Sequence, residues 1–436
     1  MALFFERPDF GEKAVLVHLK LNSESEPDDP REFEELVLSA GGDPVDFLTG
    51  SRSSPHAKFF VGTGKLEEIG NAVKSSGAEL VIFNHNLSPS QERNIEAELQ
   101  CRVLDRTGLI LDIFAQRART HEGKLQVELA QLHHLSTRLV RGWTHLERQK
   151  GGIGLRGPGE TQLESDRRMV RDRIKAIQAR LVKVRNQRAQ SRQSRVRAEI
   201  PAVSLVGYTN AGKSTLFNAV TQSDVFVADQ LFATLDPTMR KIEIDEKGVV
   251  IFADTVGFIS HLPHRLVDAF RSTLEEAANS TLLLHVVDAA SEDRANSINQ
   301  VNAVLKEIDA YELPTLMVYN KIDLLEDSTA RIDYDADGQP VAVWVSALNR
   351  EGMALLIEAV TARLPGRLVH KTLHLLPEQG ALRASMYSHK AVIHEEVDDR
   401  GCINLEVKLP EMDYFRLIKA AGLKSEDLAA LYNAAR

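Results

Sequence analysis

The chain has very few cysteines. Cys101 and Cys402 are its only two, they lie far apart, and neither belongs to a CxxC pair or a Cys/His cluster. This spacing argues against a disulfide framework and against a structural zinc site. We therefore expect both thiols to be packing residues.

Long apolar runs are also missing. No stretch approaches the roughly 20 apolar residues that a membrane span needs. Residues 1–7 lack the basic leader, apolar segment and small-residue cleavage site of a signal peptide. Hydrophobic residues make up 43% of the chain and charged residues 26%, as in soluble globular proteins. The sequence predicts a cytoplasmic protein without a membrane span.

Basic residues do not outnumber acidic ones. The formal net charge is -9, and an evenly spread charge of this sign would disfavour indiscriminate binding to nucleic acid. The basic residues are concentrated in one segment, however: Asp172 is the only acidic residue between Arg167 and Arg197. Such a run is most simply a solvated helix face, but beside a glycine-rich link it also suits contact with RNA.

The chain is long. At 436 residues it exceeds what one hydrophobic core needs, so roughly two to four domains are expected. The patterns predict a multi-domain α/β fold with four parts: an N-terminal α/β domain (1–120), a helical hairpin with a glycine-rich loop (121–198), an α/β domain with a mostly parallel sheet and flanking helices (199–366), and a small C-terminal α+β domain (367–436). In the last part, strands are predicted over 390–394 and 403–407 and a helix over 412–420.

Helical periodicity marks the second part. Apolar residues recur every three or four positions, as on one face of an amphipathic helix, at Leu125, Leu129, Leu132, Leu135 and Leu139. A second stripe comprises Val170, Ile174, Ile177, Leu181 and Val184. Because a glycine-rich link over 151–159 separates the two stripes, the pattern predicts a helical hairpin.

A phosphate-binding loop opens the third part. A buried-strand pattern over 202–206 precedes Gly207-Tyr208-Thr209-Asn210-Ala211-Gly212-Lys213-Ser214, and a helix-compatible run follows. This is the strand-to-helix context that a P-loop requires. The loop amides would face phosphate, Lys213 would reach the outer phosphates, and the Ser214 hydroxyl would bind magnesium.

A second buried strand, over 249–253, supplies the other half of a magnesium site. It ends in Asp254-Thr255-Val256-Gly257. Asp254 can hold magnesium through a water molecule, and the Gly257 amide can sense a γ-phosphate.

Two later motifs predict the base. A strand over 316–319 leads into Asn320-Lys321-Ile322-Asp323, whose last carboxylate can accept hydrogen bonds from N1 and N2 of guanine. Adenine lacks that pair of donors, so it would leave the carboxylate desolvated and unpaired. A strand over 341–345 leads into Ser346-Ala347-Leu348, whose backbone can meet guanine O6. In this order, the motifs predict a GTP-binding domain.

The expected switch I segment lies between the P-loop and Asp254. It reads Leu231-Phe232-Ala233-Thr234-Leu235-Asp236-Pro237-Thr238, and residues 232–236 are expected to contact the nucleotide. A threonine here completes magnesium coordination only when GTP is bound. Thr234 and Thr238 both have the right chemistry, and spacing alone does not choose between them.

The residue after Gly257 departs from the usual pattern. Ras-like GTPases place a water-orienting glutamine there, whereas this chain has Phe258, so slow intrinsic turnover is predicted. Either another group enters on partner binding, or a cation supplies the missing charge stabilisation. Asn210 can offer a carboxamide oxygen to potassium, as in GTPases that use this ion, or it merely tolerates the backbone angles of the loop.

Three stretches make the whole chain resemble the HflX family of ribosome-associated GTPases: residues 151–168, residues 232–236, and residues 254–259 leading into Leu262-Pro263. The resemblance favours Thr234 over Thr238. We accordingly assign magnesium ligation to Ser214 and Thr234, and catalytic roles to Lys213, Thr234 and Gly257.

The resemblance also implies partners. It implies a monomer that binds GTP and GDP, and whose N-terminal domain and hairpin enter the large ribosomal subunit near its catalytic centre when GTP is bound. Members of the family are thought to split or rescue stalled ribosomes. Since glycines allow close approach to RNA, the contact candidates are Arg156, Arg167 and Arg168.

The alternatives to a ribosome-associated GTPase are a GTPase that gates an RNA-modification system and a purely regulatory GTP-binding protein that does not hydrolyse GTP. A GTPase that gates an RNA-modification system would need a second set of catalytic residues. The sequence shows no cysteine nucleophile, flavin fingerprint or metal cluster outside the GTP-binding domain over 199–366. Some family members are reported to hydrolyse ATP through the N-terminal region. The one candidate loop there, Val61 to Leu66, has Phe59 where the first P-loop glycine would stand and Leu66 in place of Ser or Thr. It predicts a turn before a helix.

Overall fold

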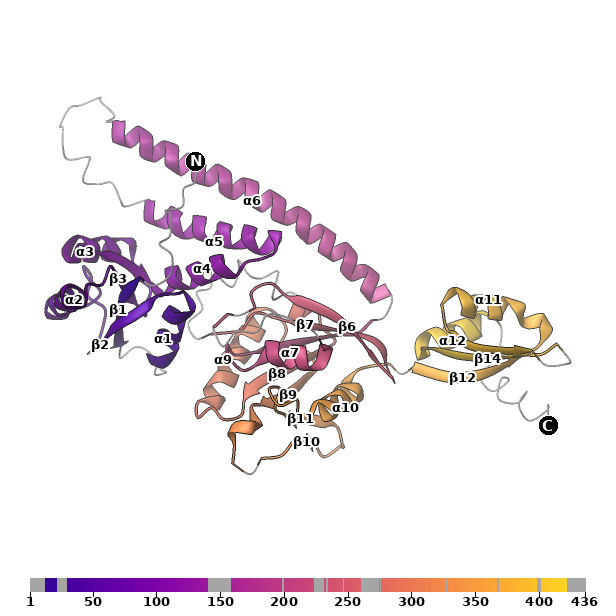
Figure 1. Cartoon of the computed structure of the whole chain (residues 1–436). Coiled ribbons are helices and arrows are strands. Elements are labelled where there is room, and N and C mark those ends of the chain that lie inside the picture. Colours follow the sequence, from indigo (N-terminus) through magenta and orange to yellow (C-terminus); the bar gives the residue numbers. More distant parts are fainter. Residues whose placement is uncertain are drawn as a thin grey trace.

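The computed structural model describes residues 12–21, 30–139, 158–197, 200–222, 231–232, 234–245, 247–259, 274, 276–326, 328–366, 368–397 and 401–421. Four units follow one another: the first, third and C-terminal units each have their own sheet, and the second is a hairpin of two long helices that lies along the first and third units (Figure 1). The predicted multi-domain α/β class is confirmed, whereas the boundaries at 120, 198 and 366 stay predictions. No helix in the described ranges combines the length and apolar character of a membrane span.

The N-terminal unit is a parallel sheet of order β2-β1-β3-β4. All four residues of β3 are buried, as expected for a parallel strand covered on both faces. Of the turn predicted over Val61 to Leu66, only Val61 and Gly62 precede helix α2, which begins at Thr63. The elements are β1 (Lys13–Leu21), α1 (Pro30–Ser39), β2 (Asp43–Arg52), α2 (Thr63–Ser76), β3 (Leu80–Phe83), α3 (Pro89–Leu99), β4 (Arg102–Asp105) and α4 (Arg106–Arg117).

The helical hairpin consists of α5 (His121–Leu139) and α6 (Pro158–Arg197). Helix α6 begins inside the predicted link, at a proline, which is favourable in the first turn of a helix. Leu125 of α5 packs with Ile177 and Leu181 of α6. The stripe prediction is wrong at Leu135, which is 41% exposed, because the cluster between the helices reaches only as far as Leu132.

The third unit has a seven-stranded sheet of order β10-β11-β9-β8-β5-β7-β6. Its inner strands are parallel, while edge strands β6 and β10 are antiparallel to their neighbours. The carboxyl ends of the parallel strands therefore share one edge, the usual place for a ligand. The elements are β5 (Ala202–Gly207), α7 (Lys213–Thr221), β6 (Thr238–Ile244), β7 (Gly248–Asp254), β8 (Leu282–Asp288), α9 (Arg294–Glu307), β9 (Thr315–Asn320), η2 (Ile322–Leu324), β10 (Arg331–Tyr334), β11 (Pro340–Trp344) and α10 (Met353–Arg363).

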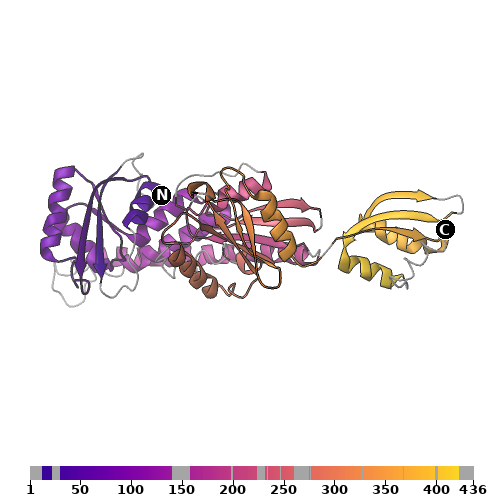
Figure 2. The same cartoon turned by 90° about the horizontal axis from the view of Figure 1, so that it is seen from below.

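The C-terminal unit is a separate antiparallel sheet of order β12-β14-β13 at the far end of the molecule (Figure 2). The strand predicted at 390–394 is shifted: the amide of Lys390, whose φ is 54°, donates to Tyr387 O and closes a turn before β13. β12 and α11 were not predicted. The elements are β12 (Leu368–Leu375), η3 (Pro377–Gln379), α11 (Gly380–Ser388), β13 (Val392–Val397), β14 (Ile403–Pro410) and α12 (Glu411–Ala420).

One hydrophobic core crosses from the N-terminal unit into the third unit. Phe33 of α1 and Phe114 of α4 belong to it, together with Leu231, Phe232 and Leu235 of the predicted switch I segment. The rings of Phe114 and Phe232 meet edge to face, with centroids 4.7 Å apart. The switch segment is thus part of the packing of the N-terminal unit.

Candidate functional site: a nucleotide pocket joined to the N-terminal unit

A cavity of about 410 Å³ opens at the carboxyl edge of the seven-stranded sheet. The predicted motifs converge on it: it is lined by Thr209, Asn210, Gly212, Lys213, Ser214, Phe232, Thr234, Thr255, Gly257, Asn320, Lys321, Asp323, Ala347 and Leu348, among others. Leu348 is 75% exposed, at the rim. Ala233 lies outside the described residues.

The P-loop curls between β5 and α7. Gly212 has a φ of 86°, and a Cβ there would collide with the Asn320 amide, so only glycine suits the turn. Lys213 Nζ donates to the carbonyl oxygens of Gly207 (3.1 Å) and Tyr208 (2.7 Å). Burial lowers the pKa of Lys213 to about 8, and the charge of Asp254 opposes that shift. A phosphate group would give this buried ammonium the counter-charge that it lacks.

Three oxygens meet where the sequence predicts magnesium. Asp254 Oδ2 accepts from Ser214 Oγ (2.7 Å) and from Thr234 Oγ1 (2.8 Å), and the two hydroxyl oxygens are 2.7 Å apart. Burial raises the pKa of Asp254, while these two hydrogen bonds oppose the rise. Thr238, the alternative threonine, instead begins edge strand β6. The structure therefore brings Thr234 to this cluster.

The base end of the pocket is built inside the third unit. Asn320 Nδ2 donates to Ala211 O (2.9 Å), and its Oδ1 accepts from the amide of Ala347 (2.9 Å). Ser346 Oγ donates to Asp323 Oδ1 at 2.5 Å. These bonds join the two loops predicted to meet guanine to each other and to the P-loop. Ile322 is buried below them.

Lys321 lies beside the pocket in an ion pair. Its Nζ is 2.8 Å from Asp288 Oδ2 at the end of β8. The side chain thus follows the rim of the cavity, where its stem can cover the face of a bound base.

The side chain of Asp236, in the predicted switch I segment, contacts the residues just before helix α5. Its carboxylate accepts hydrogen bonds from the amides of Arg119 and Thr120, both 2.8 Å, and from Thr120 Oγ1 at 2.5 Å. Thr120 directly precedes helix α5 and is its N-cap, since its Oγ1 accepts from the amide of Gly123 at 2.9 Å. A switch I carboxylate therefore holds the N-cap residue of the first hairpin helix. A Cβ on Gly123 would collide with this carboxylate. In the structure the Asp236 carboxylate contacts the hairpin, while its contact with the nucleotide stays a prediction.

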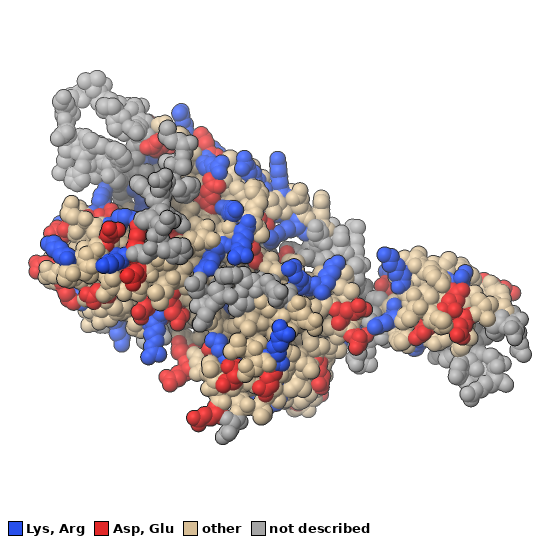
Figure 3. All heavy atoms as spheres, viewed as in Figure 1, with Lys and Arg blue, Asp and Glu red and all other residues tan. Residues whose placement is uncertain are grey.

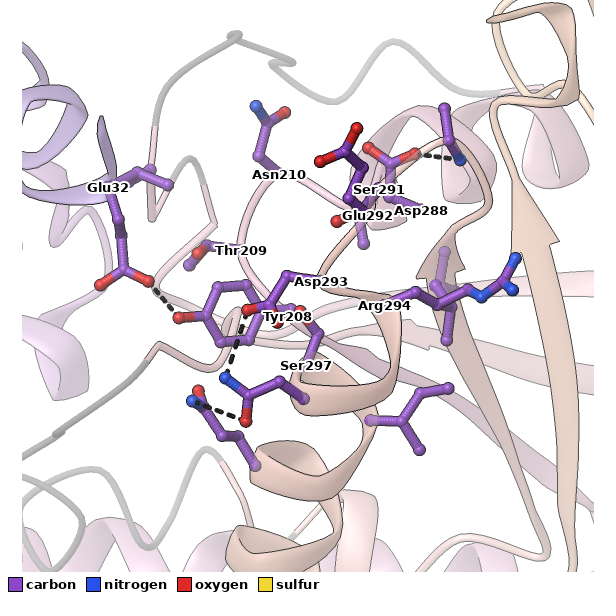
Figure 4. Close-up of a pocket in the computed structure, with 18 of the residues that line it drawn as sticks. Glu32, Tyr208, Thr209, Asn210, Asp288, Ser291, Glu292, Asp293, Arg294 and Ser297 are labelled. Atoms are coloured by element: carbon purple, nitrogen blue, oxygen red, sulfur yellow. Dashed lines mark hydrogen bonds between the residues drawn. The ribbon is translucent and has the colours of Figure 1, made fainter. Parts of the chain in front are cut away.

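The P-loop also reaches the N-terminal unit. The Tyr208 hydroxyl donates to Glu32 of α1, whose other carboxylate oxygen accepts from Arg106 at 2.5 Å. Arg106 donates in turn to Asn84 Oδ1 at 2.5 Å. Figure 4 shows the Glu32–Tyr208 pair at one side of a second cavity, of about 620 Å³, between α1 and the start of α9. No short-range pattern in the sequence indicates this buried chain of polar groups.

Phe258, which stands where Ras-like GTPases have glutamine, and Asn210, the candidate potassium ligand, differ in their surroundings. Phe258 is 2% exposed and packs with Val206, Leu274 and Leu283. Asn210 is exposed and has a φ of 57°, and its amide points away from the Glu32–Tyr208 pair (Figure 4). Both interpretations of Asn210 remain, because asparagine is among the non-glycine residues that most readily accept this backbone angle and its side chain is exposed.

The basic face of the hairpin is largely exposed. The basic side chains along α6 lie at the surface in Figure 3. Two of them hold α5: Arg173 pairs with Glu128 (2.6 Å) and Arg188 with Glu122 (2.8 Å). Arg168 is exposed and Arg167 is half-buried, whereas Arg156 lies outside the described residues.

Four family models match successive parts of the chain. They are described as GTP-binding GTPase N-terminal (residues 28–115), GTP-binding GTPase Middle Region (117–195), 50S ribosome-binding GTPase (202–321) and HflX C-terminal domain (331–427).

Curated relatives agree with these matches. GTPase HflX of Escherichia coli strain K12 is 59% identical over 415 residues, covering 95% of this chain and 97% of that protein. GTPase HflX of Caldanaerobacter subterraneus subsp. tengcongensis is 44% identical over 391 residues, covering 89% of each. A crystal structure of an SsGBP and GDP complex is 27% identical, covers 80% of this chain and 97% of that chain, and has a TM-score of 0.47. This chain therefore belongs to the HflX family of GTPases, for which hydrolysis of GTP to GDP and phosphate is the expected activity.

Proposed function

We propose that this protein is a monomeric cytoplasmic GTPase that binds the large ribosomal subunit, and that GTP binding and hydrolysis control this association in splitting or rescuing stalled ribosomes. The observation that carries the proposal is the contact between the nucleotide switch and the hairpin. Asp236 holds Thr120, the N-cap residue of α5, and Phe232 packs in the core of the N-terminal unit. A change of switch I on hydrolysis would therefore act directly on the basic hairpin.

The charge of α6 supports an RNA partner. Exposed basic side chains on this helix include Arg168, Arg171, Lys175, Arg180, Lys183 and Arg185. Close basic side chains repel one another unless an anionic partner neutralises them. One family model matching this chain is described as a 50S ribosome-binding GTPase, which agrees with an RNA-rich partner.

Sedimentation with purified ribosomal subunits tests the proposal. The protein should co-sediment with large subunits in the presence of a non-hydrolysable GTP analogue and much less with GDP. A triple variant of Lys175, Arg180 and Arg185 to alanine should lose this binding and its salt dependence. The matched control replaces three exposed basic residues elsewhere: Lys74, Arg240 and Lys390.

The same experiment separates the rival function. Equal sedimentation with GDP and with the analogue, or none with either, would contradict ribosome binding under GTP control. GTP hydrolysis stimulated by transfer RNA but not by ribosomal subunits would instead favour a GTPase that gates an RNA-modification system.

Magnesium fits the three-oxygen cluster. Ser214 and Thr234 would bind the ion directly, and Asp254 would hold one of its waters. The fit rests on Asp254 Oδ1, which is buried and has no hydrogen-bond partner in the described part of the chain. When bound, the ion neutralises phosphate charge. The chain's own contribution is to hold these oxygens together and to place Lys213 beside them.

Potassium at Asn210 is the second cation of the proposal. Hydrolysis should be faster in potassium than in sodium at equal ionic strength, because Asn210 would supply an oxygen ligand to the larger ion. In Asn210→Ala the difference between the two salts should vanish. Equal wild-type rates in both salts would remove potassium from the mechanism and leave the magnesium site untouched.

A further inference from the structure

Thr209 carries an unexplained buried hydroxyl. Its side chain is only 6% exposed, and its Oγ1 has no hydrogen-bond partner among the residues that the structure describes. A buried polar atom without a partner is costly, so its presence calls for a reason. At the same end of the pocket, Asp254 Oδ1 is in the same condition, and a water bound to magnesium accounts for it. Thr209 Oγ1 requires a different partner.

The position of Thr209 indicates that partner. Its methyl carbon Cγ2 lies 2.8 Å from the point where a Cβ on Gly257 would stand, and Lys213 Nζ lies 3.0 Å from the same point. Thr209 and Lys213 therefore both approach Gly257, whose amide is predicted to sense a γ-phosphate. Thr209 also lines the nucleotide cavity, so its side chain lies beside the place expected for the γ-phosphate of GTP.

The backbone fixes Thr209 against switch II. Its amide donates to Phe258 O at 2.7 Å, and the amide of Phe258 donates to Gly207 O at 3.1 Å. These two bonds join the P-loop to the segment that follows Gly257. Because the hydroxyl sits on this rigid pair of loops, it is already positioned before a nucleotide arrives.

The usual water-orienting group is missing at this point. Position 258 holds a phenylalanine that is packed in the core with Leu274 and Leu283. Its ring can neither accept a hydrogen bond from water nor leave the core without opening a cavity. Thr209 stands on the facing loop, with a hydroxyl that can both donate and accept.

We propose that Thr209 orients the attacking water, donating its hydroxyl proton to a γ-phosphate oxygen while accepting a hydrogen bond from that water. The water oxygen bonds to the γ-phosphorus, the bond from phosphorus to the β–γ bridging oxygen breaks, and the water proton leaves on inorganic phosphate. Thr209 is unchanged by this step. The role rests on the GTP hydrolysis of the proposed function, and it identifies the group that replaces the absent glutamine.

The test compares two variants that separate the hydroxyl from the methyl group. Thr209→Val keeps the branched shape and removes the hydroxyl, whereas Thr209→Ser keeps the hydroxyl. Single-turnover hydrolysis at saturating GTP should slow by about 10- to 100-fold in the valine variant. The serine variant should keep at least about a third of the wild-type rate, since its hydroxyl can form the same two bonds.

Nucleotide affinity distinguishes orientation from structural damage. GDP should bind Thr209→Val within about twofold of wild type, because GDP has no γ-phosphate for the hydroxyl to contact, while a non-hydrolysable GTP analogue should bind a few-fold more weakly. A valine variant as fast as wild type, a serine variant as slow as the valine variant, or an equal loss of GDP affinity would each overturn the role of Thr209. A wild-type protein that does not hydrolyse GTP would instead defeat the proposed function itself.

Discussion

The two ends of the nucleotide pocket are held by different parts of the molecule. At the base end, Asn320, Asp323 and Ser346 are joined by hydrogen bonds that stay within the third unit. At the phosphate end, Phe232 and Asp236 are held by α4 and by the start of α5. Base recognition is therefore independent of the N-terminal unit, whereas the switch cannot rearrange without disturbing that unit and the hairpin.

Replacing Phe232 with alanine should produce the largest effect. The ring is buried against Phe114, and losing it should cost about 3–5 kcal/mol of local stability. Hydrogen exchange of the α4 amides measures this loss, and selectivity for guanine over adenine should survive. The matched control is Leu348→Ala at the base end, where an exposed side chain should matter little. Unchanged exchange in α4 would show that the switch does not support the N-terminal unit.

Asp323→Asn examines the opposite end. An amide cannot accept two hydrogen bonds from guanine, so GDP affinity should fall by about 3 kcal/mol, roughly 100-fold. Xanthosine diphosphate, which has an acceptor at C2, should bind the variant better than GDP does. Calorimetry measures both affinities. Altered hydrogen exchange in α5 would contradict the independence of the base end.

Asp236→Ala removes the switch I carboxylate that holds Thr120, the N-cap residue of α5. Loss of three hydrogen bonds at the start of the helix should cost about 1–2 kcal/mol, and the amides near Thr120 and Gly123 should exchange faster. Asp236→Asn keeps an acceptor oxygen and should lose less. If the α5 amides exchange as slowly in both variants as in wild type, the contact between switch I and the hairpin does not stabilise α5.

Alkaline pH should weaken nucleotide binding at the phosphate end. In the nucleotide-free protein, burial lowers the pKa of Lys213 to about 8. Because bound phosphate favours the ammonium form, nucleotide binding above that pH is accompanied by uptake of a proton. The protonation of Lys213 alone should lower the affinity for GDP about fivefold between pH 8 and pH 9. Between pH 6 and pH 7 its contribution should be nearly constant. Calorimetry at pH 8.5 in buffers of different ionisation enthalpy should detect about three quarters of a proton taken up. Proton release would show the opposite linkage.

The nucleotide motifs could be predicted from the sequence because each is local. The strand, loop and helix around Lys213 occupy consecutive positions, and glycines at 207 and 212 fit backbone angles that favour them. The C-terminal unit was harder. β12 and α11 lack a strong period, and the turn at Lys390 moved β13 along the chain. Leu135 matched the helical stripe, yet it has no facing residue in the hairpin cluster.

The sequence by itself determined the chemistry of the pocket and the basic character of α6, because residue type and short spacing specify both. Only the tertiary structure decided what holds the switch. Tyr208 and Glu32 are 176 positions apart, and Asp236 and Thr120 are 116 apart. No periodic pattern pairs residues over such distances; these contacts arise because the packing of the N-terminal core against the third unit brings them together.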